Sequence, residues 1–283
     1  MSLWQKKTSF KNIKPRKILG QNFLVDKNII KKVIKTANLK PKDIVLEVGP
    51  GFGALTEKII LSAKKIVAVE KDDKLSKILQ EKFEKFENIK IINKDILKLN
   101  ISDIRPPKKA RLQNYKLVAN LPFYAGSRII RMFLELKNPP EEMVLIVQKE
   151  VAQRICARPP RMNLLAVSVQ ALSKPKIISY VPKKCFKPKP KVDGAIIKIV
   201  PRKRKKKSKK RINYNDNDFF KIIKAGFSHP RKKLANNLSG ELKLNKQKIV
   251  LLLSEQGIGP NQRAETLDIE SWINLAKKIK KEK

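Results

Sequence analysis

Short apolar segments alternate with helical patterns through the first 200 residues, and this alternation constrains the fold more than any other feature. The segments predicted as strands are Ile44–Val48, Ile66–Val69, Ile89–Ile92, Leu117–Ala119, Val144–Val147, Ile177–Val181 and Ala195–Val200. Several are almost continuously apolar, as expected for strands covered by helices on both faces. Segments between them, such as Asp72–Phe86 and Ser127–Leu136, have helical periodicity. The sequence therefore predicts an α/β fold with a doubly wound, mostly parallel, Rossmann-like sheet.

Both ends of this alternating region change character. Before it, Val25–Ala37 carries one apolar helical face, with Asp26 as the expected N-cap. After it, nine of the eleven residues in Pro201–Arg211 are basic, which predicts a solvated linker. Beyond the linker, helical patterns without strands cover Asp218–Phe227, Arg231–Leu238, Lys246–Glu255 and Ile269–Lys280. We predict an α/β domain over 1–200, whose first 40 residues are an extension and a helix, a linker over 201–211 and a small helical domain over 212–283.

The charge balance points to a polyanionic partner. The 283 residues include 66 Lys and Arg against 25 Asp and Glu, a formal net charge of +41. Lys and Arg side chains that neutralise phosphates release condensed counterions, so nucleic acid is the expected partner. No apolar run approaches the ~20 residues that span a bilayer. We therefore expect no membrane association.

The N-terminal and cysteine patterns point to a reducing compartment. The first 15 residues are basic and lack the apolar stretch of a secretion signal. Cys156 and Cys185 lie far apart and form no CxxC pair. They are expected to be free thiols in a cytoplasmic protein that has neither a disulfide framework nor a metal site.

A glycine-rich turn follows the first predicted strand of the sheet, in the segment DIVLEVGPGFGALTEKI (43–59). Gly49, Gly51 and Gly53 allow the backbone to approach a ligand closely and to adopt positive φ. The following helix start presents backbone amides to an anionic or carboxylate group. The spacing differs from the dinucleotide fingerprint, because Ala54 stands where the third glycine of that motif would be. Gly49 and Gly51 are therefore candidate cofactor-binding residues.

Carboxylates end the next two predicted strands. Glu70 follows an apolar strand and is placed to accept hydrogen bonds from both ribose hydroxyls of a nucleoside. This role fits NAD and S-adenosylmethionine equally, and a solvated acid at a strand end would look the same. Asp95, after the third strand, is placed to accept from the amino group of a cofactor adenine. The ordered series Gly49, Glu70 and Asp95 carries more weight than any one of these residues.

The segment Asn-Leu-Pro-Phe (120–123) follows the fourth strand and suits methyl transfer to an aromatic exocyclic amine. Such a nitrogen is a poor nucleophile, and two acceptors aimed at its N–H groups stabilise the charge that develops. The Asn120 side-chain oxygen and the Leu121 carbonyl are the predicted acceptors, Pro122 stiffens the turn, and Phe123 stacks on an extruded base. The same residues also suit an ordinary turn. Their place after Gly49, Glu70 and Asp95 favours catalysis.

With these motifs, the chain resembles the small-subunit branch of the ribosomal RNA adenine dimethyltransferases. The matching segments are LGQNFL (19–24), EVGPGFGALT (47–56), VEKD (69–72), NLPF (120–123), QKEVAQR (148–154), FKPKPKVD (186–193), FSHPRKKLANNL (227–238) and GIGPNQRAETL (257–267). The resemblance implies that Asn22, Leu24, Gly49, Glu70, Asp95 and Asn120 line an S-adenosylmethionine pocket. It also implies that Phe186 closes on the other face of the target base.

Two segments depart from the family pattern. After the catalytic turn the family usually has Asn, then Ile and Ser or Thr, whereas Tyr124–Ser127 stands here. Phe123 replaces the commoner Tyr, and Arg158–Leu164 lacks the expected Gly and Tyr. These departures affect the predicted base pocket. His229, beside a basic cluster, is expected to be structural or to face phosphate rather than to be catalytic.

The resemblance implies N6,N6-dimethylation of two adjacent adenosines in a hairpin loop near the 3′ end of small-subunit rRNA, as a step of ribosome biogenesis. The expected cofactor is S-adenosylmethionine, and the expected state is a monomer without an obligate protein partner. The alternatives are a large-subunit rRNA enzyme that confers antibiotic resistance and a non-catalytic RNA-binding assembly factor. A NAD-dependent reductase is a more distant alternative.

Overall fold

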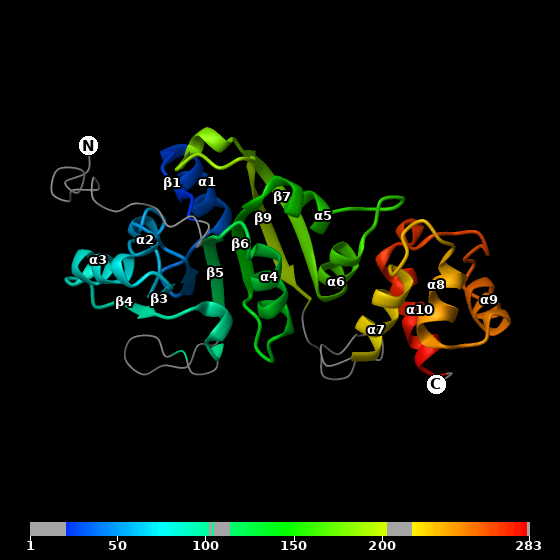
Figure 1. Cartoon of the computed structure of the whole chain (residues 1–283). Helices are drawn as coiled ribbons and strands as arrows, with labels where there is room; N and C mark the ends of the chain where they lie inside the picture. Colours follow the sequence, from blue (N-terminus) through cyan, green and yellow to red (C-terminus); the bar gives the residue numbers. More distant parts are fainter. Residues whose placement is uncertain (1–20, 102–103, 105–113, 203–216, 282–283) are drawn as a thin grey trace.

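A seven-stranded sheet forms the centre of the computed structural model, which describes residues 21–101, 104, 114–202 and 217–281 (Figure 1). Its strand order is β4-β3-β2-β5-β6-β9-β7. The strands are β2 (Ile44–Val48), β3 (Lys65–Glu70), β4 (Ile89–Asn93), β5 (Tyr115–Asn120), β6 (Glu142–Gln148), β7 (Ser173–Val181) and β9 (Gly194–Pro201). Neighbouring strands from β4 to β6 pair in parallel, and β9 is antiparallel to both β6 and β7. The predicted fold class is confirmed, and each predicted strand is present.

Helices follow the strands as the sequence predicts. Asp26 and Asp72 cap α1 (Lys27–Ala37) and α3 (Asp73–Phe83), each accepting two backbone amides in the first turn. The other helices of the sheet region are α2 (Thr56–Ile59), α4 (Gly126–Glu135), α5 (Lys149–Ile155) and α6 (Leu164–Leu172). The C-terminal helices are α7 (Asn217–Gly226), α8 (Leu234–Leu242), α9 (Lys246–Ser254) and α10 (Ile269–Lys281). The helix expected after the glycine-rich turn is α2, whereas α5 and α6 were not predicted from the sequence.

The sheet lies between two helical layers. Alternate residues of β2 contribute to different cores, with Val45 in one and Leu46 in the other. Helices α1, α2 and α3 pack on the side of Val45, whereas α4, α5 and α6 pack on the side of Leu46. This two-sided burial explains why the strand sequences are apolar without strict alternation.

Strand order reverses between β2 and β5. The chain passes from β2 outward to β3 and β4 and then returns to β5 on the other side of β2. In open α/β sheets a crevice forms at the carboxyl ends of the strands at such a switch point, and ligands bind there. Gly49 follows β2 and Asn120 ends β5, so the two most informative sequence motifs lie at this position.

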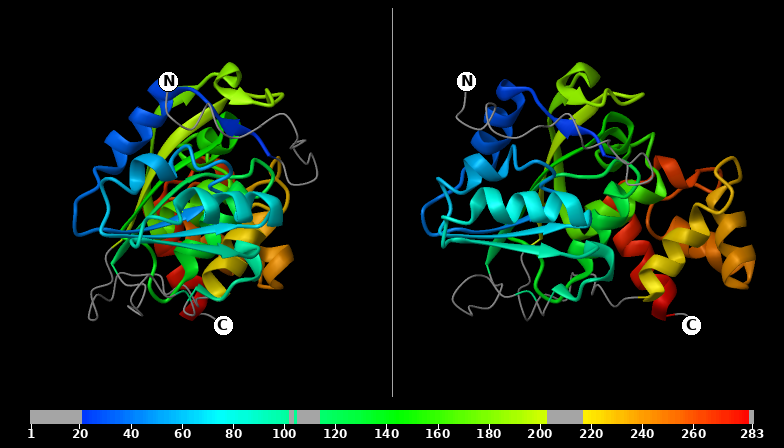
Figure 2. Two further views of the ribbon diagram at one scale, coloured as in Figure 1. Left: turned by 90° about the vertical axis from the view of Figure 1, so that its left-hand side faces the viewer. Right: turned by 60° about the vertical axis from the view of Figure 1, so that its left-hand side comes forward.

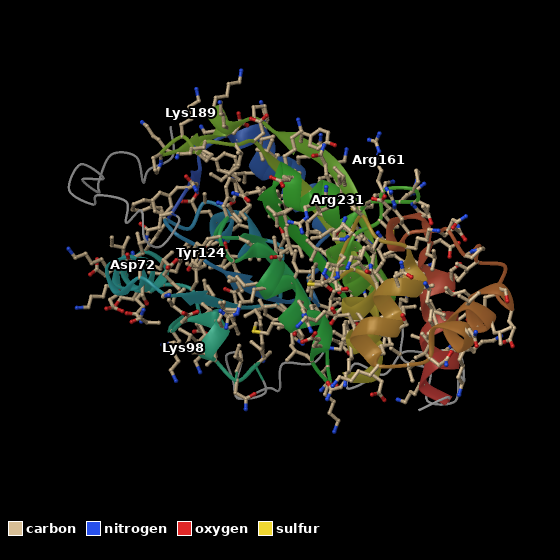
Figure 3. All side chains as sticks on the ribbon, turned by 45° about the vertical axis from the view of Figure 1, so that its right-hand side comes forward. Asp72, Lys98, Tyr124, Arg161, Lys189 and Arg231 are labelled. Atoms are coloured by element: carbon tan, nitrogen blue, oxygen red, sulfur yellow. The ribbon has the colours of Figure 1, made fainter. Side chains whose placement is uncertain are left out.

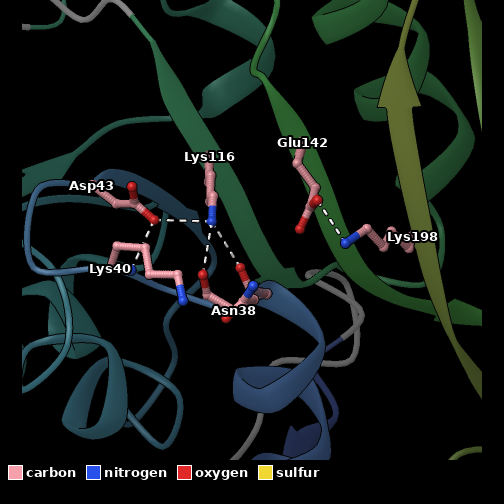
Figure 4. Close-up of polar contacts among 7 residues, drawn as sticks. Asn38, Lys40, Asp43, Lys116, Glu142 and Lys198 are labelled. Atoms are coloured by element: carbon pink, nitrogen blue, oxygen red, sulfur yellow. Dashed lines mark hydrogen bonds and ion pairs between the residues drawn. The ribbon is translucent and has the colours of Figure 1, made fainter.

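A lysine ties α1 to the opposite end of β5. Lys116 forms an ion pair with Asp43 at 2.9 Å and donates to the carbonyls of Ala37 and Asn38 at the C-terminus of α1 (Figure 4). Nearby, Lys198 pairs with Glu142 at 2.6 Å across β6 and β9. These contacts satisfy helix-end carbonyls and fix the amino-terminal edge of the sheet, away from the switch point.

The C-terminal helices lie together at one end of the molecule and share a core of their own (Figures 1 and 2). Trp272 is fully buried there and stacks on Phe227, with ring centroids 5.2 Å apart. Helix α6 serves both units, since Val169 packs in the sheet core and Ala166 in the helical core. Of the predicted linker, only Pro201 and Arg202 lie in the described residues, and Pro201 ends β9.

An additional two-stranded sheet was not predicted. It pairs β1 (Phe23–Leu24) antiparallel with β8 (Phe186–Lys187). The partners are separated by more than 160 positions in the sequence, and each strand has only two residues. Neither segment is long enough to carry a periodic pattern.

Candidate active site

A pocket opens at the switch point and collects residues from the ends of four strands. Its lining comes from the N-terminal segment, the glycine-rich turn, the ends of β3 and β4, and the turn after β5. Of the predicted cofactor-binding residues, it includes Asn22, Gly49, Gly51, Glu70, Asp95 and Asn120. Residues separated by up to 98 positions in the sequence thus face one cavity.

The glycine-rich turn has the backbone conformation that its glycines allow. Gly49, Gly51 and Gly53 have φ of 65°, 61° and 81°, a region that favours glycine. A Cβ on Gly51 would lie 2.8 Å from a ring carbon of Phe23, so a side chain there would force the two apart. A Cβ on Gly53 would likewise lie 2.9 Å from Phe83, so the turn is close-packed at both of these glycines.

Backbone amides hold the Glu70 carboxylate in place. One oxygen accepts from the Gly51 amide at 3.0 Å and the other from the Asp72 amide at 2.9 Å. Burial raises the pKa of Glu70, and these two hydrogen bonds act in the opposite direction. Each oxygen keeps a second lone pair, so the carboxylate can still accept from two ligand hydroxyls.

Asp95 lines the same pocket from the segment after β4. One of its oxygens caps the short helix 96–98 by accepting from the Leu97 amide at 3.0 Å. The other forms an ion pair with Lys71 at 3.0 Å. Burial would raise the pKa of Asp95, but the Lys71 ammonium and the Leu97 amide lower it overall. Asp95 is therefore an ionised acceptor beside the apolar side chain of Ile96.

The turn after β5 is held by hydrogen bonds on both sides. The Asn120 amide nitrogen donates to the Asn22 carbonyl at 2.8 Å, and the Leu121 amide donates to Ile146 at 3.0 Å. The Pro122 carbonyl accepts from Ala125 at 3.0 Å and closes the turn. The Asn120 side-chain oxygen is buried without a hydrogen-bond partner among the described residues. An unsatisfied buried acceptor is costly, so a ligand N–H in this pocket would be stabilised by it.

The predicted base-stacking rings do not enclose an open slot. Phe123 and Phe186 contact each other edge to face, with centroids 5.7 Å apart. Phe186 is 2% exposed, and its ring packs against Gly194. A base sandwiched between two rings needs about 7 Å, two van der Waals contacts of ~3.5 Å. The stacking role of Phe186 stays a prediction and requires the rings to separate.

Leu24 does not line the pocket. Its side chain is buried in the core between α1 and the sheet, and its backbone pairs with Phe186. Phe23, which the sequence analysis passed over, lines the pocket instead and packs against Phe52 at 4.6 Å. Gln21 and Tyr124 also line it and were missed. The segment LGQNFL (19–24) pointed to Gln21 and Phe23, and the departure from the family pattern pointed to Tyr124.

The remaining sequence candidates lie outside the pocket. His229 is exposed, and its carbonyl accepts from Asn237 in the helical unit, consistent with a structural role. Cys156 and Cys185 are free thiols. Within the described residues there is no cluster of His, Cys, Asp and Glu that would hold a metal ion. No helix in that part of the chain is long and apolar enough to cross a membrane.

The glycine-rich turn, the strand-end acids and the Asn-Leu-Pro-Phe turn surround one pocket at the switch point of the sheet. This arrangement is that of an S-adenosylmethionine-dependent methyltransferase. The orphaned Asn120 oxygen, the two strand-end acids and the close-packed glycines fit such a cofactor. The family model for ribosomal RNA adenine dimethylase matches residues 12–281. The chain belongs to that family.

Relatives and solved structures agree with this assignment. Proteins named ribosomal RNA small subunit methyltransferase A from Dehalococcoides mccartyi and Geobacillus kaustophilus are 45% and 37% identical. The alignments cover 93% and 92% of this chain and 88% and 89% of those proteins. A dimethyladenosine transferase structure from Plasmodium falciparum has a TM-score of 0.77 at 23% identity, covering 92% of this chain and 98% of that one, and it shares the fold.

A structure of the 23S rRNA methyltransferase ErmE is also similar. Its TM-score is 0.69 at 25% identity, and the match covers 92% of this chain and all of that one. The fold is therefore shared with a dimethyladenosine transferase and with a 23S rRNA methyltransferase, and the fold alone does not identify the substrate.

Proposed function

We propose that this chain methylates, twice each, the N6 amines of two adjacent adenosines in a hairpin loop near the 3′ end of small-subunit rRNA. The reaction would contribute to small-subunit biogenesis in the cytoplasm, with the protein acting as a monomer. The observation that carries the proposal is the buried, unpartnered oxygen of Asn120 inside the switch-point pocket. The relatives named for the small subunit, at 37–45% identity over most of the chain, support the choice of rRNA.

The turn at Asn120 is suited to hold an amine. Donation from the Asn120 amide nitrogen to Asn22 orients the side chain so that its oxygen is left as an acceptor. The Leu121 carbonyl is the second proposed acceptor, on a residue whose own amide donates to the Ile146 carbonyl. Two acceptors aimed at the N–H groups would favour a tetrahedral, more nucleophilic nitrogen. Bound S-adenosylmethionine would supply the methyl group on a sulfonium, which is already an activated leaving group.

The other pocket residues would bind and orient. Glu70 would accept from the ribose hydroxyls and Asp95 from the cofactor's adenine amine. The positive-φ glycines let the backbone approach the ligand. Phe123, half-buried beside the turn, would stack on the target adenine once it is extruded. Unpaired loop adenosines suit this arrangement, since sequence-specific RNA recognition favours splayed-out bases.

Basic residues outside the pocket would hold the RNA backbone. Lys189, Arg161 and Arg231 are exposed and lie on separate parts of the fold (Figure 3). They extend from the β8–β9 connection, the α5–α6 connection and the segment before α8. We propose that the helical domain over 212–283 and the basic linker over 201–211 contribute phosphate contacts, which position RNA without reading its sequence.

Two alternatives predict different products. The likeness to ErmE favours a large-subunit substrate, whereas the relatives at higher identity favour the small subunit. A non-catalytic assembly factor would have no need of the unpartnered Asn120 oxygen. Purified small subunits lacking the modification, and matched large subunits, are incubated with labelled S-adenosylmethionine and digested to nucleosides. N6,N6-dimethyladenosine is expected from small subunits; its appearance only in large subunits, or in neither, would overturn the proposal.

A further inference from the structure

An aromatic side chain that no motif explains stands at the rim of the pocket. Tyr124 is 58% exposed, although most large apolar side chains of the sheet region are buried. It lines the pocket together with Asn120 and Pro122. Figure 3 labels its position on the fold. The family resemblance implies Asn at this position, whereas this chain has Tyr. An exposed ring over a pocket is a surface that a bound ligand can cover.

Tyr124 shares the pocket with the residues around Asp95. Lys71 lines the same cavity as Tyr124, and its hydrogen-bonded ion pair with Asp95 is the largest cause that raises the pKa of Lys71. Lys71, in turn, lies 3.0 Å from Asp95. Ile96 and Leu97, from the turn after β4, line the same cavity. Tyr124 and the acid after the third parallel strand therefore line one cavity.

The two aromatic residues of the turn have different surroundings. Phe123 contacts Phe186 and is not among the pocket-lining residues, whereas Tyr124 lines the pocket. The Ala125 amide donates to the Pro122 carbonyl, and this hydrogen bond closes the turn that carries both rings. One ring is therefore available to the predicted target-base side and the other to the side of Asp95.

We propose that Tyr124 is a cofactor-binding residue whose ring packs against the adenine of S-adenosylmethionine. The inference rests on the proposed function only in taking that molecule as the ligand. Asp95 supplies the acceptor for the adenine amine, Ile96 an apolar contact, and Tyr124 an aromatic wall. Stacking of a base on an aromatic ring contributes about 1–3 kcal/mol, which corresponds to a change of roughly 5- to 150-fold in Kd. The hydroxyl at the tip of the ring stays in water.

The test measures binding of S-adenosylhomocysteine and of adenosine by calorimetry, without RNA. Tyr124→Asn, which restores the usual family residue, is expected to raise both Kd values about tenfold. The loss should be equal for the two ligands, because they share the adenine. Tyr124→Phe keeps the ring, and both of its Kd values should stay within about twofold of those of the unaltered protein. Tyr180→Asn removes another exposed aromatic residue outside the pocket and should leave both Kd values unchanged.

The outcomes separate this inference from the proposed function. Unchanged cofactor binding in Tyr124→Asn overturns the role of Tyr124, and so does a rise confined to KM for RNA, which would place the ring on the target base. A loss for S-adenosylhomocysteine without one for adenosine would place it on the amino-acid part and also overturn the inference. If the unaltered protein binds neither ligand, the proposed cofactor itself is wrong.

Discussion

The proposed cofactor side of the pocket and the proposed target-base side next to it meet at Asn120 but are built differently. On the cofactor side, Glu70 is held by two backbone amides and Asp95 by an amide and an ion pair. On the target-base side, Phe123 and Phe186 contact each other with no gap for a base. The first side is organised before a ligand arrives, whereas the second has to open. The contrast suggests that cofactor binding costs little rearrangement and that RNA binding includes a local movement.

Removing the acceptor shared by both sides should have the largest effect. Asn120→Ala deletes the buried oxygen proposed to hold the target amine. Loss of one preorganised group of this kind lowers turnover by ~10²–10³-fold. The measurement is single-turnover methyl incorporation at saturating cofactor, with RNA binding followed separately by filter retention. RNA binding should be unaffected; full-rate transfer by the variant would remove Asn120 from the mechanism.

The next test asks whether Phe186 serves the fold or the base. The ring is 2% exposed and packed against Gly194, so Phe186→Ala should lower the free energy of unfolding by ~3–5 kcal/mol. Urea denaturation measures this. Phe186→Leu keeps most of the volume and should cost less than ~1.5 kcal/mol. If Phe186→Leu also transfers methyl groups normally, the stacking role implied by the family resemblance is wrong.

Glu47, a buried acid in the strand before the glycine-rich turn, should make the free energy of unfolding depend on pH. Burial raises the pKa of Glu47 to about 8, and its carboxyl accepts from Thr56 at 2.7 Å. In the unfolded chain this group titrates near 4.5, the ordinary value. Between these two pKa values the folded state binds more protons, so the free energy of unfolding should fall as pH rises from 4.5 to 8. The fall is on the order of a few kcal/mol, at ~1.4 kcal/mol per pKa unit.

Glu47→Gln should flatten this dependence, because the amide does not titrate. Denaturation curves at pH 5 and pH 8 provide the comparison, and Glu241→Gln, at an exposed position, serves as the control. An unaltered slope in Glu47→Gln would mean that the carboxyl is not the source of the pH dependence. Base-side variants such as Phe186→Leu should keep the slope of the unaltered protein.

The same contrast explains which features were predictable from the sequence. Strands, capping residues such as Asp26 and the glycine-rich turn depend on neighbours in the sequence, and their patterns appear locally. The cofactor side is assembled mostly from such strand-end motifs. Phe23 and Tyr124 were missed because their positions in the pocket depend on distant segments: Phe23 lies over Gly51, and Tyr124 lines the pocket together with Lys71. The edge contact between Phe123 and Phe186 likewise joins residues 63 positions apart, which no periodicity records.

The smallest expected effect concerns the hydroxyl that Phe123 lacks. The ring is half-buried, so Phe123→Tyr adds a polar group that can reach water and should change stability by less than ~0.5 kcal/mol. If Phe123 binds the base by stacking alone, the rate of methyl transfer by Phe123→Tyr should stay within about twofold of that of the unaltered protein, because the π face is unchanged. Phe123→Ala, which removes that face, should raise KM for RNA by roughly 5- to 150-fold. A large gain in the rate of methyl transfer by Phe123→Tyr would instead mean that a hydroxyl hydrogen bond helps to hold the base. Separation of the Phe123 and Phe186 rings alone would then not complete the binding site for the base.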